Sequence, residues 1–277
     1  MSQVDWKENN MEWNQVEEEA DPFSLDSICS SRHWSSVKAV VYGVPGIGKT
    51  SFAATFPSPI LIRTEDGASA LDIPTFPKVI ETVQELMKCL DVLEKQRHGF
   101  KTVIIDSLDW LEGMVWRGVC AKNGKKHIED FPYGKGYVIV DEAWHHITGK
   151  LDKLQAKGMN IIAICHSAIT TIMTPDSDDY MSYGLKLHKR GAAIWTEWAD
   201  ELLFINYDKN IVRSDKEGGK LKAQGNGNRI IYTASRPAYL AKSRYPLPEE
   251  ILIGQDKTWA AFHECLSEAS GGQYTNK

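Results

Sequence analysis

The sequence predicts an α/β fold in which helices cover both faces of a mostly parallel β-sheet, with an antiparallel extension towards the C-terminus. Two observations lead to this prediction. Short apolar runs alternate with longer segments in which apolar residues recur every three or four positions. A glycine-rich segment, residues 43–50, separates the first apolar run from the first helical segment. The 277 residues, of which 42% are hydrophobic and 25% charged, suffice for one large domain of this class.

Four apolar runs are expected to form the parallel strands, at residues 37–42, 59–63, 102–106 and 160–165. Helical spacing predicts helices at residues 49–56, 82–96, 108–120 and 137–154. Strands of the antiparallel extension are expected at residues 201–207, 211–213 and 229–233, followed by a last helix at about residues 252–267. Residues 37–253 would then form the core domain, and residues 254–277 a C-terminal helix and tail.

Residues 1–36 differ from the rest of the chain in their charge. They carry eight acidic side chains against Lys7 and Arg32, a net charge of −6, whereas the whole chain carries −5, which leaves +1 for residues 37–277. This acidic N-terminal extension is either a poorly ordered tail or an arm that docks aromatic residues on a neighbouring subunit. Those aromatic residues are Trp6, Trp13, Phe23 and Trp34. The near-neutral remainder does not exclude a nucleic-acid partner.

Composition excludes several other classes of protein. The five cysteines are scattered without CxxC spacing, which indicates reduced thiols and neither a zinc site nor a disulfide framework. No apolar run approaches the roughly 18 residues that a membrane span needs. The polar, acidic N-terminus does not have the pattern of a secretory signal. We therefore expect a cytoplasmic protein without a membrane partner.

Residues 43–50 fit the pattern G-x-x-x-x-G-K-[ST] in full, between a predicted strand and a predicted helix. In this phosphate loop, glycines let backbone N–H groups surround phosphate oxygens, and the helix N-terminus adds positive potential. Lys49 is expected to reach the β- and γ-phosphates of ATP, and the Thr50 hydroxyl to bind Mg²⁺. The residues expected to bind the nucleotide here are Gly43, Val44, Pro45, Gly46, Ile47, Gly48, Lys49, Thr50 and Ser51.

An acidic residue is expected to complete the Mg²⁺ site. Asp106 ends the predicted strand 102–106, at the edge of the sheet where the phosphate loop begins, and can hold the metal directly or through water. Asp141 and Glu142 offer a second acidic pair after an apolar run. Helical spacing continues through that pair, so we favour Asp106 and expect Asp141 and Glu142 on the outer face of a helix.

Two further polar residues follow predicted strands. If the strand 59–63 neighbours the strand before the phosphate loop, Glu65 faces the γ-phosphate and can polarise the attacking water. Asp66 is the nearest alternative, and a solvent-exposed turn acid is the other interpretation of Glu65. His166 follows the strand 160–165 and is either a contact of the γ-phosphate or a residue that caps the strand without a ligand.

Together these features resemble the ATPase core of RecA-like recombinases, within the P-loop NTPases. They are most similar to phage-encoded ATP-binding proteins with a minimal RecA-like core, which act in single-strand annealing and recombination. Residues 241–248, Ala-Lys-Ser-Arg-Tyr-Pro-Leu-Pro, are similar to an Ala-Lys-Asn-Arg-aromatic stretch of those proteins and to the Lys-Asn-Arg-Phe-Gly motif of the bacterial RadA ATPase. The resemblance spans residues 37–253. It departs from these patterns at Ser243, at Pro246 and at His166, where RecA itself has Gln.

The resemblance implies that the protein hydrolyses ATP, with Glu65 as the catalytic glutamate. It implies a homo-oligomer in which Lys242 and Arg244 reach the ATP site of the neighbouring subunit and complete it. It also implies that loops after the third and fourth strands bind single-stranded DNA. A single-strand-binding protein is a further candidate partner.

Basic and aromatic residues in those loops agree with single-strand binding, which needs phosphate neutralisation and base stacking. The first loop contributes Lys122, Lys125, Lys126, Phe131 and Tyr133. A long polar loop is expected at residues 170–190, and it contributes Lys186, Lys189 and Arg190. Asp176, Asp178 and Asp179 oppose DNA contact in its first half. A solvated surface loop is the alternative in both places.

Three functions compete on these observations. The first is an ATPase of DNA recombination. The second is an AAA-type ATPase or helicase loader that remodels a protein partner, which the absence of Glu after Asp106 disfavours unless Asp141 and Glu142 are the true acidic pair. The third is a small-molecule kinase, which would need several arginines in a lid near the phosphates, whereas the arginines here are scattered.

Overall fold

The computed structural model describes residues 24–28, 36–67, 71–175, 177–208, 210–213, 221–224, 227–254 and 259–274. Most of the acidic N-terminal extension lies outside these residues, and so do its four aromatic side chains. Within the extension the structure describes one 3-10 turn, Leu25–Ser27. All the other helices and strands belong to a second unit, residues 34–277.

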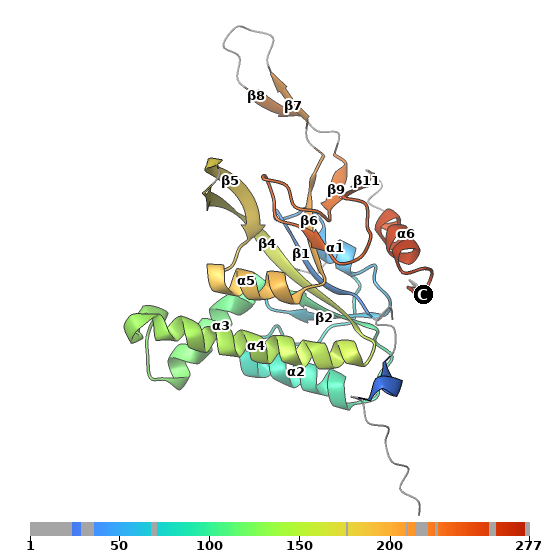
Figure 1. Cartoon of the computed structure of the whole chain (residues 1–277). Coiled ribbons are helices and arrows are strands. Elements are labelled where there is room, and N and C mark those ends of the chain that lie inside the picture. The colour runs from blue at the N-terminus through green and yellow to red at the C-terminus, as the bar shows by residue number, and fades with distance from the viewer. Residues whose placement is uncertain are drawn as a thin grey trace, which may run out of the picture. The chain divides into compact units, whose positions relative to one another are not determined.

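Five strands form the parallel part of the sheet (Figure 1). They are β1 (Lys38–Gly43), β2 (Pro59–Arg63), β3 (Thr102–Asp106), β4 (Asn160–Thr174) and β6 (Glu201–Tyr207). Their order across the sheet is β6-β1-β4-β3-β2, and each pairs in parallel with its neighbours. The prediction was wrong for β6, which we expected in the antiparallel extension. The chain reaches β6 through a helix, and a helical crossover returns it in the direction of β1.

The antiparallel strands extend the sheet beyond β6. β9 (Arg229–Tyr232) pairs with β6, β11 (Glu250–Ile253) pairs with β9, and the short β10 (Lys242–Ser243) pairs with β6. β7 (Asn210–Arg213) and β8 (Leu221–Gln224) form a separate two-stranded ladder. The predicted α/β class, mostly parallel with antiparallel C-terminal strands, is confirmed.

The sequence analysis missed β11 and placed the last helix too early. Side chains of β11 alternate between exposed and buried, which is the two-residue period of a strand. The last helix, α6, begins after it and spans Ala260–Ala269.

The predicted polar loop at residues 170–190 is also wrong. β4 continues past Cys165 to Thr174 and pairs antiparallel with β5 (Ser177–Leu185), so this region is a β-hairpin. The chain then enters α5 (Lys189–Trp198). The sequence Ile169-Thr-Thr-Ile172 is rich in β-branched residues, which favour strands.

Helices cover the two faces of the sheet unequally. α2 (Val83–Lys95), α3 (Leu108–Lys122), α4 (Lys135–Ala156) and α5 bury apolar side chains against one face. α1 (Lys49–Ala53) and α6 pack on the other. Two 3-10 turns, Ile128–Asp130 and Pro132–Gly134, join α3 to α4. No helix among the described residues is long and apolar enough to cross a membrane.

Candidate nucleotide site

The phosphate loop connects the carboxyl end of β1 to α1. Gly48 precedes α1 with a φ of 106°, in the left-handed region that residues with a Cβ atom avoid. A Cβ atom at Gly43 would lie 2.3 Å from the carbonyl oxygen of Ile205 in β6, so this position has room for glycine alone. The two glycines therefore fix the path of the loop along the edge of the sheet.

Lys49 is buried, and its ammonium group lies inside the loop. Its Nζ atom donates hydrogen bonds to the carbonyl oxygens of Gly43 at 3.0 Å and Val44 at 3.1 Å. Burial lowers the pKa of Lys49, and the nearby charge of Asp106 opposes this shift. Neutral carbonyl oxygens are weaker partners for an ammonium group than phosphate oxygens, so the loop suits an anionic ligand.

Thr50 and Asp106 meet at the same edge of the sheet. The Thr50 hydroxyl donates a 2.8 Å hydrogen bond to a carboxylate oxygen of Asp106, which ends β3. Burial raises the pKa of Asp106, the hydrogen bond from Thr50 lowers it, and the charge of Glu65 raises it again. A hydroxyl and a carboxylate this close present two of the hard oxygen donors that Mg²⁺ prefers.

Glu65 lies two residues beyond β2, but β2 does not neighbour β1, because β3 and β4 lie between them. The expectation that the strand before Glu65 neighbours the strand before the phosphate loop is therefore wrong. The pairing of β2 with β3 still brings Glu65 beside Asp106, since its Oε1 accepts a 3.1 Å hydrogen bond from the Ser107 hydroxyl. Thr64 fixes this junction by donating a 2.9 Å bond to the Ser107 carbonyl oxygen.

His166 pairs with Gly43 across β4 and β1, so it lies at the same edge as the phosphate loop. Its Nδ1 atom lies 3.0 Å from a carboxylate oxygen of Asp109 in α3, and its backbone N–H also donates to Asp109. Burial raises the pKa of Asp109, but the hydrogen bonds from His166 outweigh it and bring the pKa down to about 2. Asp109 thus holds the imidazole in place; the sequence analysis overlooked it, although it lies only three residues after Asp106.

The alternative acidic pair lies elsewhere. Asp141 and Glu142 are in α4, and the carboxylate of Asp141 accepts a 2.7 Å hydrogen bond from Arg190 Nε. Glu142 is exposed. Neither contacts Thr50, whereas Asp106 does.

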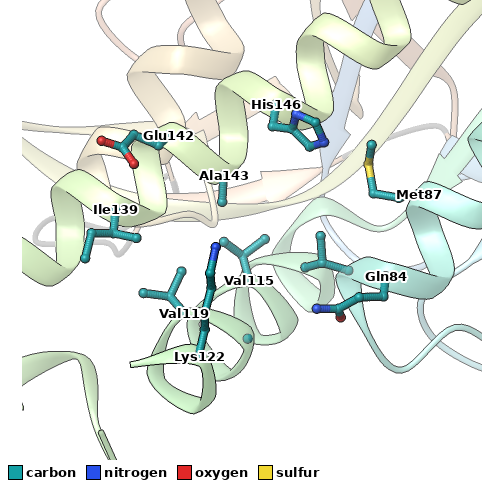
Figure 2. Close-up of a pocket in the computed structure, with 11 residues that line it drawn as sticks. Gln84, Met87, Val115, Val119, Lys122, Ile139, Glu142, Ala143 and His146 are labelled. Atoms are coloured by element: carbon teal, nitrogen blue, oxygen red, sulfur yellow. The ribbon is translucent and has the colours of Figure 1, made fainter. Parts of the chain in front are cut away.

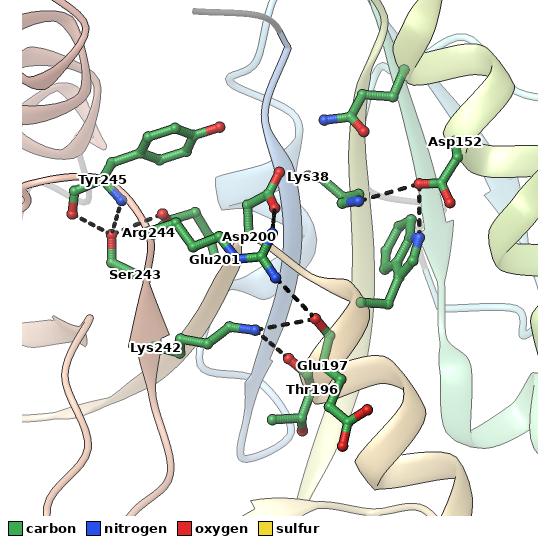
Figure 3. Close-up of polar contacts among 12 residues, drawn as sticks. Lys38, Asp152, Thr196, Glu197, Asp200, Glu201, Lys242, Ser243, Arg244 and Tyr245 are labelled. Carbon is green, nitrogen blue, oxygen red and sulfur yellow. Dashed lines mark hydrogen bonds and ion pairs between the residues drawn. The ribbon is translucent and has the colours of Figure 1, made fainter. Parts of the chain in front are cut away.

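Lys242 and Arg244 lie near the amino ends of the parallel strands, whereas the phosphate loop of their own chain lies at the carboxyl ends. Figure 3 shows their polar contacts with the end of α5 and with Asp200. Lys242 in β10 pairs with Leu202 near the start of β6. Its ammonium group donates to carbonyl oxygens at the end of α5, and burial lowers its pKa. Arg244 forms a 2.8 Å ion pair with Asp200, whose backbone N–H bonds to the first residue of β1. Within one chain, Lys242 aligns through Leu202 with Val40, three residues before Gly43, so about 10 Å of strand separates it from the start of the phosphate loop.

The predicted DNA-binding residues between α3 and α4 are only partly available. Lys122, Lys125 and Lys126 are exposed, and Tyr133 is fully exposed. Phe131 is 8% exposed and packs in the core, so its ring cannot stack on a base, and the expectation is corrected at this residue. Lys122 also lines an apolar pocket of 570 Å³ between α2, α3 and α4 (Figure 2).

The predicted DNA-binding residues of the second region lie at the end of the β4–β5 hairpin and the start of α5. Lys186 and Lys189 are exposed, and Lys186 Nζ lies 3.7 Å from Asp109, which also holds His166. Arg190 is bound to Asp141 and is therefore already paired. Lys186 thus lies close to the end of the sheet that carries the phosphate loop, because its partner Asp109 also holds His166, which pairs with Gly43.

No curated protein matches the sequence. Among solved structures, the RadB recombinase is similar with a TM-score of 0.43 and 13% identity, over 80% of this chain and 90% of that one. The flagellar accessory protein FlaH from Methanocaldococcus jannaschii has a TM-score of 0.39 and 12% identity, over 79% of this chain and 84% of that one.

One family model covers most of the domain. The model AAA_24, described as an AAA domain, matches residues 35–245. The match includes the phosphate loop, Asp106, His166 and the Lys242–Arg244 segment, and it agrees with the predicted P-loop NTPase class. Because it covers more than half of the 277 residues, the chain belongs to this family of AAA domains.

Proposed function

We propose that this protein is a RecA-like ATPase of phage DNA recombination that binds ATP with Mg²⁺, assembles into a homo-oligomer and acts on single-stranded DNA by annealing or strand exchange. The observation that carries the ATPase part is the hydrogen bond between Thr50 and Asp106 beside a buried, charge-unpaired Lys49. This is the arrangement that a metal–triphosphate complex needs.

Each residue of the site has a distinct task in this proposal. Lys49 would bind the β- and γ-phosphates, and Thr50 and Asp106 would hold Mg²⁺, which neutralises phosphate charge when bound. Glu65 would accept a hydrogen bond from the attacking water and orient it, as it now accepts one from Ser107. His166, held by Asp109, would contact the γ-phosphate and link it to the β4–β5 hairpin, which begins immediately after it.

The position of Lys242 and Arg244 supports the proposed oligomer. Because they lie at the amino ends of the parallel strands, they can serve only the phosphate loop of another subunit. If subunits stack so that the carboxyl ends of the strands in one subunit face the amino ends of the strands in the next, the two halves of the proposed site come together. The same arrangement would line up the β4–β5 hairpins and exposed lysines of successive subunits along one strand of DNA.

The test is the rate of ATP hydrolysis with and without single-stranded DNA. We expect strong stimulation that weakens as salt rises, because phosphate contacts release counterions. Lys125→Ala combined with Lys126→Ala, at two exposed positions remote from the phosphate loop, should reduce the stimulation and leave the DNA-free rate unchanged. A rate that single-stranded DNA does not change, with oligomer present at low salt, would overturn the DNA part of the proposal and leave the ATPase part standing.

The match to an AAA domain favours a second candidate, an ATPase that remodels a protein partner. Such a protein would show a rate that responds to its partner and not to DNA. The same assay therefore separates the two candidates, since DNA stimulation supports only the first.

A further inference from the structure

Arg229 is a buried cation that the proposed reaction does not yet use. It is the first residue of β9, and its side chain is 7% exposed. Its Nε atom is fully buried without a hydrogen-bond partner, and no described carboxylate forms an ion pair with it. The sequence analysis assigned no role to this residue.

The position of Arg229 relates it to the phosphate loop. Its Nε atom lies 3.9 Å from the point that a Cβ atom would occupy at Gly48, the residue before Lys49. The ring of Trp259 lies 3.2 Å from the same point. Arg229 pairs with Tyr207 across β9 and β6, and Tyr207 ends β6 two residues beyond the partner of Gly43. Arg229 therefore lies at the edge of the sheet where the loop begins.

The surroundings of Arg229 do not satisfy its charge. Burying a guanidinium nitrogen without an acceptor is unfavourable, and none of the described residues accepts a hydrogen bond from Arg229 Nε. The described contact is with the face of the Tyr207 ring, 5.9 Å from the guanidinium carbon, and such a contact compensates only part of that cost. A planar group of N–H donors beside a phosphate loop is suited to phosphate oxygens.

We propose that Arg229 is a second cationic ligand of the nucleotide, which binds a phosphate oxygen from the β6–β9 side while Lys49 binds from within the loop. This inference rests on the proposed nucleotide binding. It assigns the C-terminal antiparallel strands a part in the site, so that β9 supplies a ligand in the same chain while β10 supplies cations to the next subunit.

The test compares wild type with Arg229→Met, which keeps an unbranched apolar stem and removes the charge, and with Arg229→Lys, which keeps the charge. Affinities for a non-hydrolysable ATP analogue and for adenosine are measured by calorimetry, with exposed Arg97→Met as the matched control. We expect Arg229→Met to lower the affinity for the ATP analogue by about 10- to 100-fold. The affinity for adenosine should not change, because adenosine carries no phosphate. Arg229→Lys should recover part of the loss, and Arg97→Met should bind like wild type.

Thermal unfolding separates a ligand from a structural residue. Without nucleotide, Arg229→Met should unfold at the wild-type temperature or above it, because an uncompensated buried charge has been removed. A lower unfolding temperature together with unchanged affinity for the analogue would overturn the inference.

A structure of the wild-type protein with the analogue provides a test that needs no variant. A phosphate oxygen should lie within hydrogen-bond distance of Arg229, and a guanidinium that contacts no phosphate oxygen would overturn the inference even if both variants fail to fold. If wild type binds no analogue at all, the proposed function itself fails; if it binds and Arg229→Met binds equally well, only this inference fails.

Discussion

Lys49 and Asp106 carry opposite charges at one edge of the sheet, yet burial moves the pKa of each towards its neutral form. The attraction between them is thus smaller than the desolvation that each experiences. A phosphate group near Lys49 and a cation near Asp106 would reverse both shifts. At the scale of single residues, the site therefore pairs a buried amine with a buried carboxyl group, each of which a ligand of opposite charge would hold in its charged form.

The first prediction concerns Lys49→Ala. Affinity for ATP should fall by at least about tenfold, since a charge-assisted hydrogen bond to phosphate is lost. The unfolding temperature without nucleotide should stay near that of wild type, because Lys49 bonds only to loop carbonyl oxygens. Calorimetry and thermal unfolding measure the two quantities. Exposed Lys88→Ala is the control, and unchanged ATP affinity in Lys49→Ala would contradict the nucleotide site.

The second prediction concerns Glu65→Gln. Turnover of ATP should fall by about 100-fold or more, because the amide cannot accept the proton of the attacking water, whereas ATP affinity should be preserved. Single-turnover hydrolysis and nucleotide titration distinguish these two effects. Exposed Glu81→Gln should behave as wild type. Turnover that stays at the wild-type level would remove Glu65 from the catalytic role and return attention to Asp66.

At the scale of elements, the position of β10 depends on a buried carboxyl group. Glu201 is 0% exposed, and one of its oxygens accepts a 2.8 Å hydrogen bond from the Ser243 hydroxyl (Figure 3). Ser243 lies between Lys242 and Arg244, so Glu201 positions the segment that carries both cations. Burial raises the pKa of Glu201 to about 8, against the opposing hydrogen bonds from Ser243 and from the backbone N–H groups of Tyr245 and Arg244.

A pH dependence of stability follows from Glu201. The native carboxyl group keeps its proton up to about pH 8, whereas in the unfolded chain it ionises near its usual pKa of 4.5. Its contribution to the free energy of unfolding is therefore complete below about pH 4.5 and is lost as the pH rises through about 8. Between about pH 4.5 and pH 8, wild type should lose stability relative to Glu201→Gln, which cannot ionise. Denaturant unfolding across this range measures the difference, with exposed Glu250→Gln as the control; parallel stability curves for wild type and Glu201→Gln would contradict the raised pKa.

At the scale of the whole molecule, the two ends of the parallel strands carry complementary parts of one proposed site. The phosphate loop, Asp106, Glu65 and His166 lie at the carboxyl ends of the strands, and Lys242 and Arg244 lie at the amino ends. A single chain cannot bring these ends together, because the strands between them are rigid and paired. The proposed role of these cations at a phosphate loop therefore requires assembly of subunits.

Mixing of inactive subunits tests this arrangement. Lys242→Ala and Glu65→Gln subunits should each lack activity, and their mixture should recover part of it, because some interfaces then combine an intact Glu65 with an intact Lys242. A mixture of Glu65→Gln with Lys49→Ala subunits is the matched control and should stay inactive, since both defects lie on the same side of the interface. No recovery in the first mixture, with mixed oligomers shown to form, would exclude action between subunits.

The local pattern of the sequence was sufficient for much of the fold and for the centre of the site. A strand, a glycine-rich turn and a helix follow one another within residues 38–53, so the phosphate loop and the positions of Lys49 and Thr50 could be predicted from neighbouring residues. The alternation of apolar runs with helical spacing likewise indicated the parallel strands and α2 to α4. These features depend on contacts a few residues apart, and such contacts leave a period in the sequence.

Strand order and long-range pairing were decided only by the tertiary structure. Glu65 was expected beside β1 but reaches the site through β3, and β6 proved parallel to β1, because periodicity does not record which strand lies next to which. The polar side chains of the β4–β5 hairpin predict a loop, because its strand pairing joins residues up to 18 positions apart and leaves no local signal. The position of Arg229 could not be predicted for the same reason, because it follows Gly48 by 181 positions in the sequence. Only the pairing of β9 with β6 brings its buried charge to the phosphate loop, which the sequence alone had predicted.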